Sequence, residues 1–314
     1  MQKTIVAFIL ASLFITDACI GQPEFTLVKE WGGFGDKPGQ LKFPALIAVD
    51  QKENVYVVDQ HNHRVQKFDS NGNFITMWGK SGTGPGEFNY PYGIAIDSKG
   101  DVFVSDMNNN RIQKFSSRGD FIATVGMYGS EDGQFKYPYG IAFDQDNVLY
   151  VIDAFNYRVQ KFTNALQFLG KWGSAESIGI KLYMPHEIAV TKDGKVIMTD
   201  RQNHRVTVFS KDGQIIKRFG EYAEGALANG GAFSEPHGIA VNEAGEILIS
   251  DRYNFRIELF DASFNYKAKW NTPGISDDSK HFPLGIATGK NQIIYVTDHY
   301  AHTIQQFRVN NRNK

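Results

Sequence analysis

The chain of 314 residues is 42% hydrophobic and 13% aromatic, which is enough apolar material to bury a large core. Its 33 basic and 34 acidic residues give a formal net charge of −1. Proteins that bind nucleic acid or anionic membranes through bulk charge usually carry a basic excess, so the balance disfavours both classes.

Residues 1–21 are typical of a secretory signal. Lys3 precedes an apolar run from Ile5 to Ile15, and small residues follow the run. The run is too short to cross a bilayer, and no later segment of the sequence approaches the required length. We therefore expect export and no transmembrane segment.

Cys19 allows two ways of processing this signal. Cleavage after Gly21 would remove Cys19, the only cysteine, and release residues 22–314 as a secreted or periplasmic protein without disulfides. The alternative is lipidation of Cys19, which would anchor the chain to a membrane. Thr16 and Asp17 stand where a lipoprotein signal usually has leucine and a small residue, so cleavage is the favoured expectation.

The first expected strand covers Phe25–Gly32 and reads FTLVKEWG. It matches FITMWG at Phe74 and FLGKWG at Phe168, which end two later units of the chain. No complete unit precedes it, so this strand needs a partner from elsewhere in the sequence.

After this strand, one sequence pattern recurs six times. Each copy opens with a proline and has an aspartate fifteen residues later. The prolines stand at intervals of 47, 47, 47, 51 and 47 residues, at Pro44, Pro91, Pro138, Pro185, Pro236 and Pro283. A fixed period of this length indicates a repeat architecture, in which each unit buries its apolar face against its neighbours.

Each copy reads as four short strands. In the second copy, GIAID, DVFVSD, RIQKF and FIATVG alternate with the turn-like segments SKG, MNNN and SSRG. No window after the N-terminus shows a sustained helical apolar stripe, so the unit is a propeller blade rather than a helical repeat. The sequence therefore predicts an all-β, six-bladed β-propeller formed by residues 22–314.

The sixth copy ends at Lys314 without a fourth strand. We expect Phe25–Gly32 to complete this blade by pairing with Thr303–Phe307, which closes the ring. Closure removes the exposed sheet edge of an open array, so a single-domain monomer is expected.

Five blades carry aspartate, then asparagine three residues later and arginine five residues after the aspartate. A catalytic group is needed once, whereas a structural device is needed in every blade, so these residues are expected to fix turns through salt bridges and hydrogen bonds. The pairs are Asp59 with Arg64, Asp106 with Arg111, Asp153 with Arg158, Asp200 with Arg205, and Asp251 with Arg256.

The residue after the opening proline is not repeated. The innermost strand of a blade lines the channel, so these six side chains are expected to ring one mouth. They are Ala45, Tyr92, Tyr139, His186, His237 and Leu284. Arg201, Arg252 and His299 share a second repeat position that can reach this mouth, and their positive arc would attract an anionic ligand. His63, His204 and His302 are expected to be exposed loop residues, in blades too far apart to share an ion.

The segments PYGIAID, VFVSD and NNRIQKF resemble NHL repeats, and the resemblance covers residues 25 to 308. It implies the propeller fold but no single function, because NHL propellers serve enzymes, RNA-binding proteins and sensor domains alike. One similar branch, the peptidyl-hydroxyglycine lyases, binds zinc through histidines placed directly after the opening proline. MPHEIAV at His186 and EPHGIAV at His237 resemble those motifs. That branch uses three such histidines on non-neighbouring blades, whereas this pair is adjacent.

Two functions from different classes follow. The favoured one is a binding scaffold without a cofactor, which recognises a protein, peptide or glycan through Tyr92, Tyr139, His186, His237, Arg201, Arg252 and His299. The alternative is a zinc-dependent lyase or hydrolase with His186 and His237 as metal ligands. Catalytic zinc needs at least three protein ligands, and two histidines do not complete that set. RNA binding ranks third, because the chain is expected to be exported and lacks a basic excess.

Overall fold

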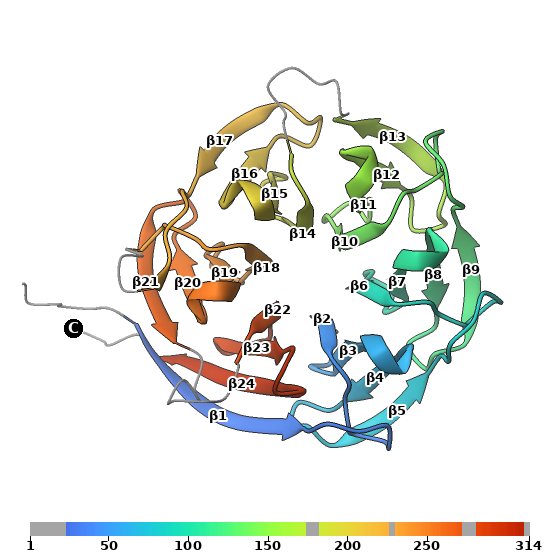
Figure 1. The fold of residues 1–314 in the computed structure, drawn as a ribbon, viewed down its shortest axis with the longest axis horizontal. Coiled ribbons are helices and arrows are strands. Elements are labelled where there is room, and N and C mark those ends of the chain that lie inside the picture. The colour runs from blue at the N-terminus through green and yellow to red at the C-terminus, as the bar shows by residue number, and fades with distance from the viewer. Residues whose placement is uncertain (1–22, 174–181, 226–229, 272–280, 311–314) are drawn as a thin grey trace, which may run out of the picture.

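The computed structural model describes residues 23–173, 182–225, 230–271 and 281–310. They form six four-stranded antiparallel sheets arranged as blades around one axis, so the prediction of a six-bladed all-β propeller is confirmed (Figure 1). The expected signal segment and Cys19 lie outside the described residues. Within these ranges, no helix is long and apolar enough to cross a membrane.

In the first five blades the strands run outward from the axis in sequence order, and in the sixth β1 is the outermost strand (Figure 1). The innermost strands are β2 (Pro44–Val49), β6 (Pro91–Ile96), β10 (Pro138–Phe143), β14 (Pro185–Val190), β18 (Pro236–Val241) and β22 (Pro283–Thr288). The second strands are β3 (Val55–Asp59), β7 (Val102–Asp106), β11 (Leu149–Asp153), β15 (Val196–Asp200), β19 (Ile247–Asp251) and β23 (Ile293–Asp298). The third strands are β4 (Arg64–Phe68), β8 (Arg111–Phe115), β12 (Arg158–Phe162), β16 (Arg205–Phe209), β20 (Arg256–Phe260) and β24 (Thr303–Asn310). The outermost strands are β5 (Phe74–Trp78), β9 (Phe121–Val125), β13 (Phe168–Trp172), β17 (Ile215–Phe219), β21 (Tyr266–Asn271) and β1 (Glu24–Gly32).

Short 3-10 turns join the second and third strands of the first five blades. They are η1 (Gln60–Asn62), η2 (Met107–Asn109), η3 (Ala154–Asn156), η4 (Arg201–Asn203) and η6 (Arg252–Asn254). The opening proline pairs across the sheet with the last residue of the second strand, as Pro91 does with Asp106. The 3-10 turns and the prolines therefore lie at the same end of the propeller, which we call the proline face.

Burial changes with distance from the axis and explains the strand order. All five residues of β7 are buried, because a second strand is covered on both sides by neighbouring blades. The outermost β9 is exposed at three of its five positions. Near the axis the strands approach closely, and a Cβ on Gly93 would lie only 2.4 Å from the carbonyl oxygen of Tyr139 in the next blade. Glycine at this position therefore lets the inner strands converge.

The repeated aspartate clamps the connection that enters its blade. Asp106 accepts hydrogen bonds from the backbone N–H of Asn89 at 2.7 Å and from the side chains of Asn109 at 2.8 Å and Arg111 at 2.8 Å. Arg111 also donates to three backbone carbonyls of that connection. The corresponding Arg–Asp distances are 2.6 Å for Arg64–Asp59, 2.7 Å for Arg158–Asp153, 2.9 Å for Arg205–Asp200 and 3.0 Å for Arg256–Asp251.

The N-terminal strand closes the ring. β1 pairs antiparallel with β24 from Gly32↔Thr303 to Glu24↔Asn310, which is longer than the predicted pairing because β24 continues to Asn310 (Figure 1). Phe25 also stacks on Trp270 of blade five, with ring centroids 3.3 Å apart. The last blade is thus complete only when both ends of the chain contribute to it.

Candidate functional site

Four side chains that follow the opening prolines meet at the proline face. Tyr92, Tyr139, His186 and His237 are 7%, 9%, 5% and 2% exposed. The Tyr92 hydroxyl lies 2.8 Å from Nδ1 of His186, and the Tyr139 ring stacks on the His186 ring with centroids 4.8 Å apart. The His186 and His237 rings are 4.3 Å apart. The structure therefore brings these four predicted residues into one continuous cluster across blades two to five.

Each histidine of the cluster faces an arginine. Nη1 of Arg201 lies 3.3 Å from Nε2 of His186, and Nη1 of Arg252 lies 3.3 Å from Nε2 of His237. A guanidinium can only donate, so both Nε2 atoms act as acceptors and both rings carry their proton on Nδ1. In agreement, Nδ1 of His237 lies 2.9 Å from the Glu235 carbonyl oxygen, to which it donates.

The charge state of the pair follows from burial. Burial lowers the pKa of His186 and of His237 well below the usual histidine value, and the nearby charges of Arg201 and Arg252 lower both pKa values further. Both imidazoles are therefore neutral at physiological pH. The positive charge at this mouth comes from the two arginines.

The two arginines differ in their other contacts. Arg201 binds the carboxylate of Glu235, with Nε at 2.6 Å and Nη2 at 2.5 Å from the same oxygen. Arg252 lies over the rings of Tyr253 and Phe282, 5.1 and 5.6 Å from their centroids. Its Nε is enclosed and has no hydrogen-bond acceptor among the described residues. The first guanidinium is thus neutralised internally, whereas the second has unused donor capacity.

His299, the third member of the expected positive arc, has a different environment. Its Nδ1 lies 3.1 Å from the carbonyl oxygen of Pro44, and its ring packs against Phe43 and Tyr300. Burial lowers its pKa to about 4, so it is neutral at physiological pH. His299 lies between blades six and one. Because it is neutral, it adds no positive charge to the expected arc.

Glu187 was not among the residues singled out from the sequence. It is 7% exposed, and its Oε2 accepts a hydrogen bond from the backbone N–H of Ile239 in the next blade at 3.0 Å. Burial raises the pKa of its carboxyl well above the usual range. The sequence did distinguish this residue. Four of the six blades have glycine at the equivalent position, so a glutamate there departs from the repeat.

Aromatic side chains surround the mouth and form a rim. Most of them precede an opening proline or lie in a neighbouring 3-10 turn. Tyr137 packs on Phe155 with centroids 5.0 Å apart, and Phe282 packs on Tyr300 at 4.7 Å. Tyr137, Phe155 and Tyr300 are 39%, 42% and 42% exposed, so part of each ring is open to contact. We call Tyr137, Phe155, Tyr253, Phe282 and Tyr300 the aromatic rim.

The expectation that His63, His204 and His302 are exposed loop residues is wrong. All three are half-buried, and their Nδ1 atoms accept hydrogen bonds from backbone N–H groups of the next blade. His63 accepts from Tyr90 at 3.2 Å, His204 from Glu235 at 3.2 Å and His302 from Phe43 at 3.0 Å. In the closed ring blades six and one are neighbours, so His302 and His63 are also closer than the linear order suggested.

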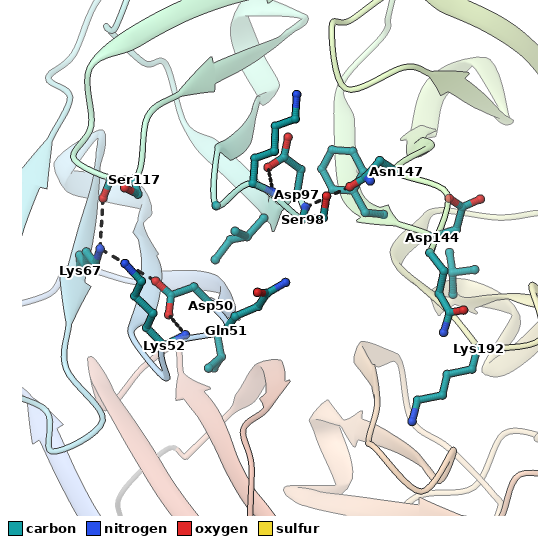
Figure 2. Close-up of a pocket in the computed structure, with 17 residues that line it drawn as sticks. Asp50, Gln51, Lys52, Lys67, Asp97, Ser98, Ser117, Asp144, Asn147 and Lys192 are labelled. Carbon is teal, nitrogen blue, oxygen red and sulfur yellow. Dashed lines mark hydrogen bonds and ion pairs between the residues drawn. The ribbon is translucent and has the colours of Figure 1, made fainter.

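A separate cavity of about 410 Å³ lies at the opposite end of the inner strands (Figure 2). It is lined mainly by the turns that join the first and second strands of blades one to four, together with Lys67 and Ser117, and it includes none of Tyr92, Tyr139, His186 and His237. Its acidic groups are engaged in their own turns. Asp50, for example, accepts the backbone N–H groups of Lys52 and Asn54. We therefore place the candidate site at the proline face, where the polar residues are not repeated.

A metal centre fits the histidine pair poorly. Within the described ranges, no group of three or more His, Cys, Asp or Glu side chains could hold a metal ion. The free lone pair of each imidazole, on Nε2, points at a guanidinium. A divalent cation bound to both atoms would lie beside two positive charges, so Arg201 and Arg252 would have to move away.

Comparison with known proteins identifies NHL repeats in this chain. The NHL repeat model matches residues 41–68, 88–115, 182–209, 233–260 and 281–307. The Drosophila melanogaster protein named brain tumor is 33% identical over 90 residues, which is 28% of this chain and 8% of that protein. The chain therefore spans less than a tenth of the length of this curated relative.

Several solved structures share the fold of this chain, although their sequence identity to it is low. A gluconolactonase from Xanthomonas campestris aligns with a TM-score of 0.67 at 14% identity, over 92% of this chain and 94% of that one. Virginiamycin B lyase from Staphylococcus aureus aligns with a TM-score of 0.62 at 16% identity, over 91% of this chain and 99% of that one. A histidine-to-alanine variant of that lyase, described as catalytically inactive and bound to quinupristin, aligns equally well. The chain therefore carries five NHL repeats and folds as a closed six-bladed β-propeller.

Proposed function

We propose that the chain is an exported binding scaffold that recognises a peptide segment, free or part of a protein, at the proline face. One observation carries the proposal. The polar residues of this mouth are not present in every blade, yet Tyr92, Tyr139, His186 and His237 stand on four equivalent strands that fix their positions. A rigid frame that presents a unique set of Tyr, His and Arg side chains is suited to recognition, because little ordering is needed on binding.

The aromatic rim supports a peptide as the ligand. Tyrosine and phenylalanine give large contact areas at small conformational cost, and a tyrosine also offers a polar tip. Rings that are about 40% exposed, as those of Tyr137, Phe155 and Tyr300 are, remain accessible while their other edges are held by neighbours. A glycan would also use aromatic rings, and the test below can reveal that outcome.

The test uses a phage library that displays random 12-residue peptides. Binders are selected from it on the immobilised protein. Selected peptides should bind the wild-type chain and lose at least tenfold in affinity to Tyr137→Ser/Tyr300→Ser. The matched control is Ile122→Ser/Ile216→Ser, which removes two exposed apolar side chains from outermost strands and should bind normally. Failure to enrich any peptide, or equal loss in both variants, would contradict the proposal. A glycan array is then the alternative screen.

The second candidate is a metal-dependent lyase or hydrolase that uses His186 and His237. It is favoured by the 4.3 Å contact between the two rings. The lyase described above is a fold neighbour in which loss of a histidine is described as abolishing catalysis. The decisive measurement is elemental analysis of protein purified without added metal, repeated on His186→Ala and His237→Ala. Stoichiometric zinc that disappears in both variants would replace the scaffold proposal; metal-free wild-type protein is the expected result.

A further inference from the structure

Arg201 and Arg252 occupy the same place in successive blades. Each is the first residue of its 3-10 turn, η4 or η6, and each approaches Nε2 of the histidine in its own blade at 3.3 Å. The backbone that presents the two guanidinium groups is therefore equivalent. Any difference between them comes from the residue that the next blade places opposite.

That opposite residue is the one before the next opening proline. For Arg201 it is Glu235, whose carboxylate accepts from Nε and Nη2. For Arg252 it is Phe282, which offers a ring face at 5.6 Å and no hydrogen-bond acceptor. A cation–π contact leaves the N–H groups of the guanidinium unsatisfied.

Two further observations indicate that Arg252 has no carboxylate partner among the described residues. Its Nε is enclosed without an acceptor in the described part of the chain, and no described carboxylate forms an ion pair with it. His237 beside it is neutral and supplies one acceptor, not a charge. A guanidinium held at a mouth with free donors is a ready site for a planar oxyanion.

We infer that Arg252 is the anchor for a carboxylate of the bound peptide, which accepts from Nη2 and supplies the negative charge that Glu235 supplies to Arg201. The inference rests on the proposed function and specifies the chemistry that the scaffold reads. The Glu235–Arg201 pair at the neighbouring blade is an example of a carboxylate bound to the equivalent arginine within this protein. Phe282, Tyr253 and Tyr300 border this position, so the peptide residue that carries the carboxylate lies against aromatic rings.

The carboxylate can be the C-terminus of the peptide or an acidic side chain, and small probes separate the two. N-acetylglycine carries only an α-carboxylate, and N-acetylaspartic acid α-amide carries only a side-chain carboxylate. N-acetylglycinamide has neither and is the matched neutral probe. Each is titrated into uniformly ¹⁵N-labelled protein, and the imidazole nitrogen signals are followed by NMR. The His237 signals are those missing from His237→Gln.

At least one carboxylate probe should move the His237 Nε2 signal saturably, with a Kd on the order of 1–10 mM for so few atoms. The neutral probe should leave the signal unmoved. Arg252→Gln should abolish the response and Arg252→Lys should retain a weaker one, because lysine keeps the charge but not the planar fork. Lys192→Gln, which removes a lysine at the opposite cavity, is the matched control and should respond as wild type.

An unmoved His237 signal, or an equal response in Arg252→Gln, would overturn the inference. Inorganic phosphate that moves the signal when neither carboxylate does would also overturn it. These results are independent of the peptide selection. A library that yields proline-face binders whose affinity is unchanged when every acidic side chain and the C-terminus are amidated would support the scaffold while refuting the carboxylate anchor.

Discussion

The buried histidine His299 makes a quantitative prediction about acid stability. Its pKa falls from the ordinary histidine value of 6.5 to about 4 because it is buried. The folded state therefore favours the neutral ring, and between pH 6.5 and 4 the unfolded chain binds more protons than the folded one. The stabilisation is complete above about pH 6.5 and is lost progressively as pH falls towards 4.

The size of the effect follows from the two pKa values. Linkage gives a loss in unfolding free energy of about 1.4 kcal/mol at pH 5.5 and about 2.5 kcal/mol at pH 4.5 from this one group. His299→Asn removes the titration and keeps a side-chain N–H that can reach the Pro44 carbonyl oxygen. The variant should be less stable than wild type at pH 7.5, and this difference should shrink by about 2.5 kcal/mol at pH 4.5.

The assay is urea unfolding followed by tryptophan fluorescence at pH 7.5, 6.5, 5.5 and 4.5. His186 and His237 also resist protonation, but they are present in both proteins, so their contributions cancel in the difference. Lys192→Gln should run parallel to wild type at all four pH values. A stability difference between wild type and His299→Asn that stays constant within about 0.5 kcal/mol would refute the assignment of a depressed pKa to His299.

Three further predictions concern closure, packing and export. Deletion of residues 22–33 should lower the thermal midpoint and promote association, since β24 loses its partner and exposes an edge; an unchanged midpoint and monomeric elution would contradict terminal closure. Gly93→Ala should cost about 2 kcal/mol or more in urea unfolding because its Cβ would meet a carbonyl oxygen, whereas Gly100→Ala, strained but unobstructed, should cost about 1 kcal/mol. Mass spectrometry of the exported protein should give a chain beginning at Gln22; a retained signal refutes cleavage, and a diacylglyceryl mass on Cys19 indicates anchoring instead.

The fold was predictable because six copies agree in register. Alternation in GIAID and VFVSD fixes which side chains face neighbouring blades, and a shift by one residue would turn every apolar side chain outward. The unmatched strand at Phe25–Gly32 identified the partner of the last blade for the same reason. The C-terminal end of β24 could not be predicted, because the residues beyond Phe307 follow no repeated pattern that marks where the strand stops.

The arrangement of the candidate site was predictable from the sequence, but its hydrogen bonding was not. The position after the proline predicted that Tyr92, Tyr139, His186 and His237 lie at one mouth, and ring contacts join these four side chains in the fold. Which nitrogen of each ring faces an arginine depends on rotamers that no spacing specifies. That orientation bears on whether the mouth suits a metal ion or an anion, so the sequence left both open.

The repeat also explains how a symmetric frame produces one asymmetric site. Each junction between blades combines three positions: the residue after the proline, the first residue of the following turn, and the residue before the next proline. Most junctions combine aromatic, apolar or amide side chains there, as Tyr139, Ala154 and Met184 do. Only two place a histidine beside an arginine, and in the first of these Glu235 neutralises the arginine. The second has phenylalanine in place of that glutamate, which leaves Arg252 as a cation without a carboxylate partner among the described residues, so the specificity that we propose rests on one departure from a repeated geometry.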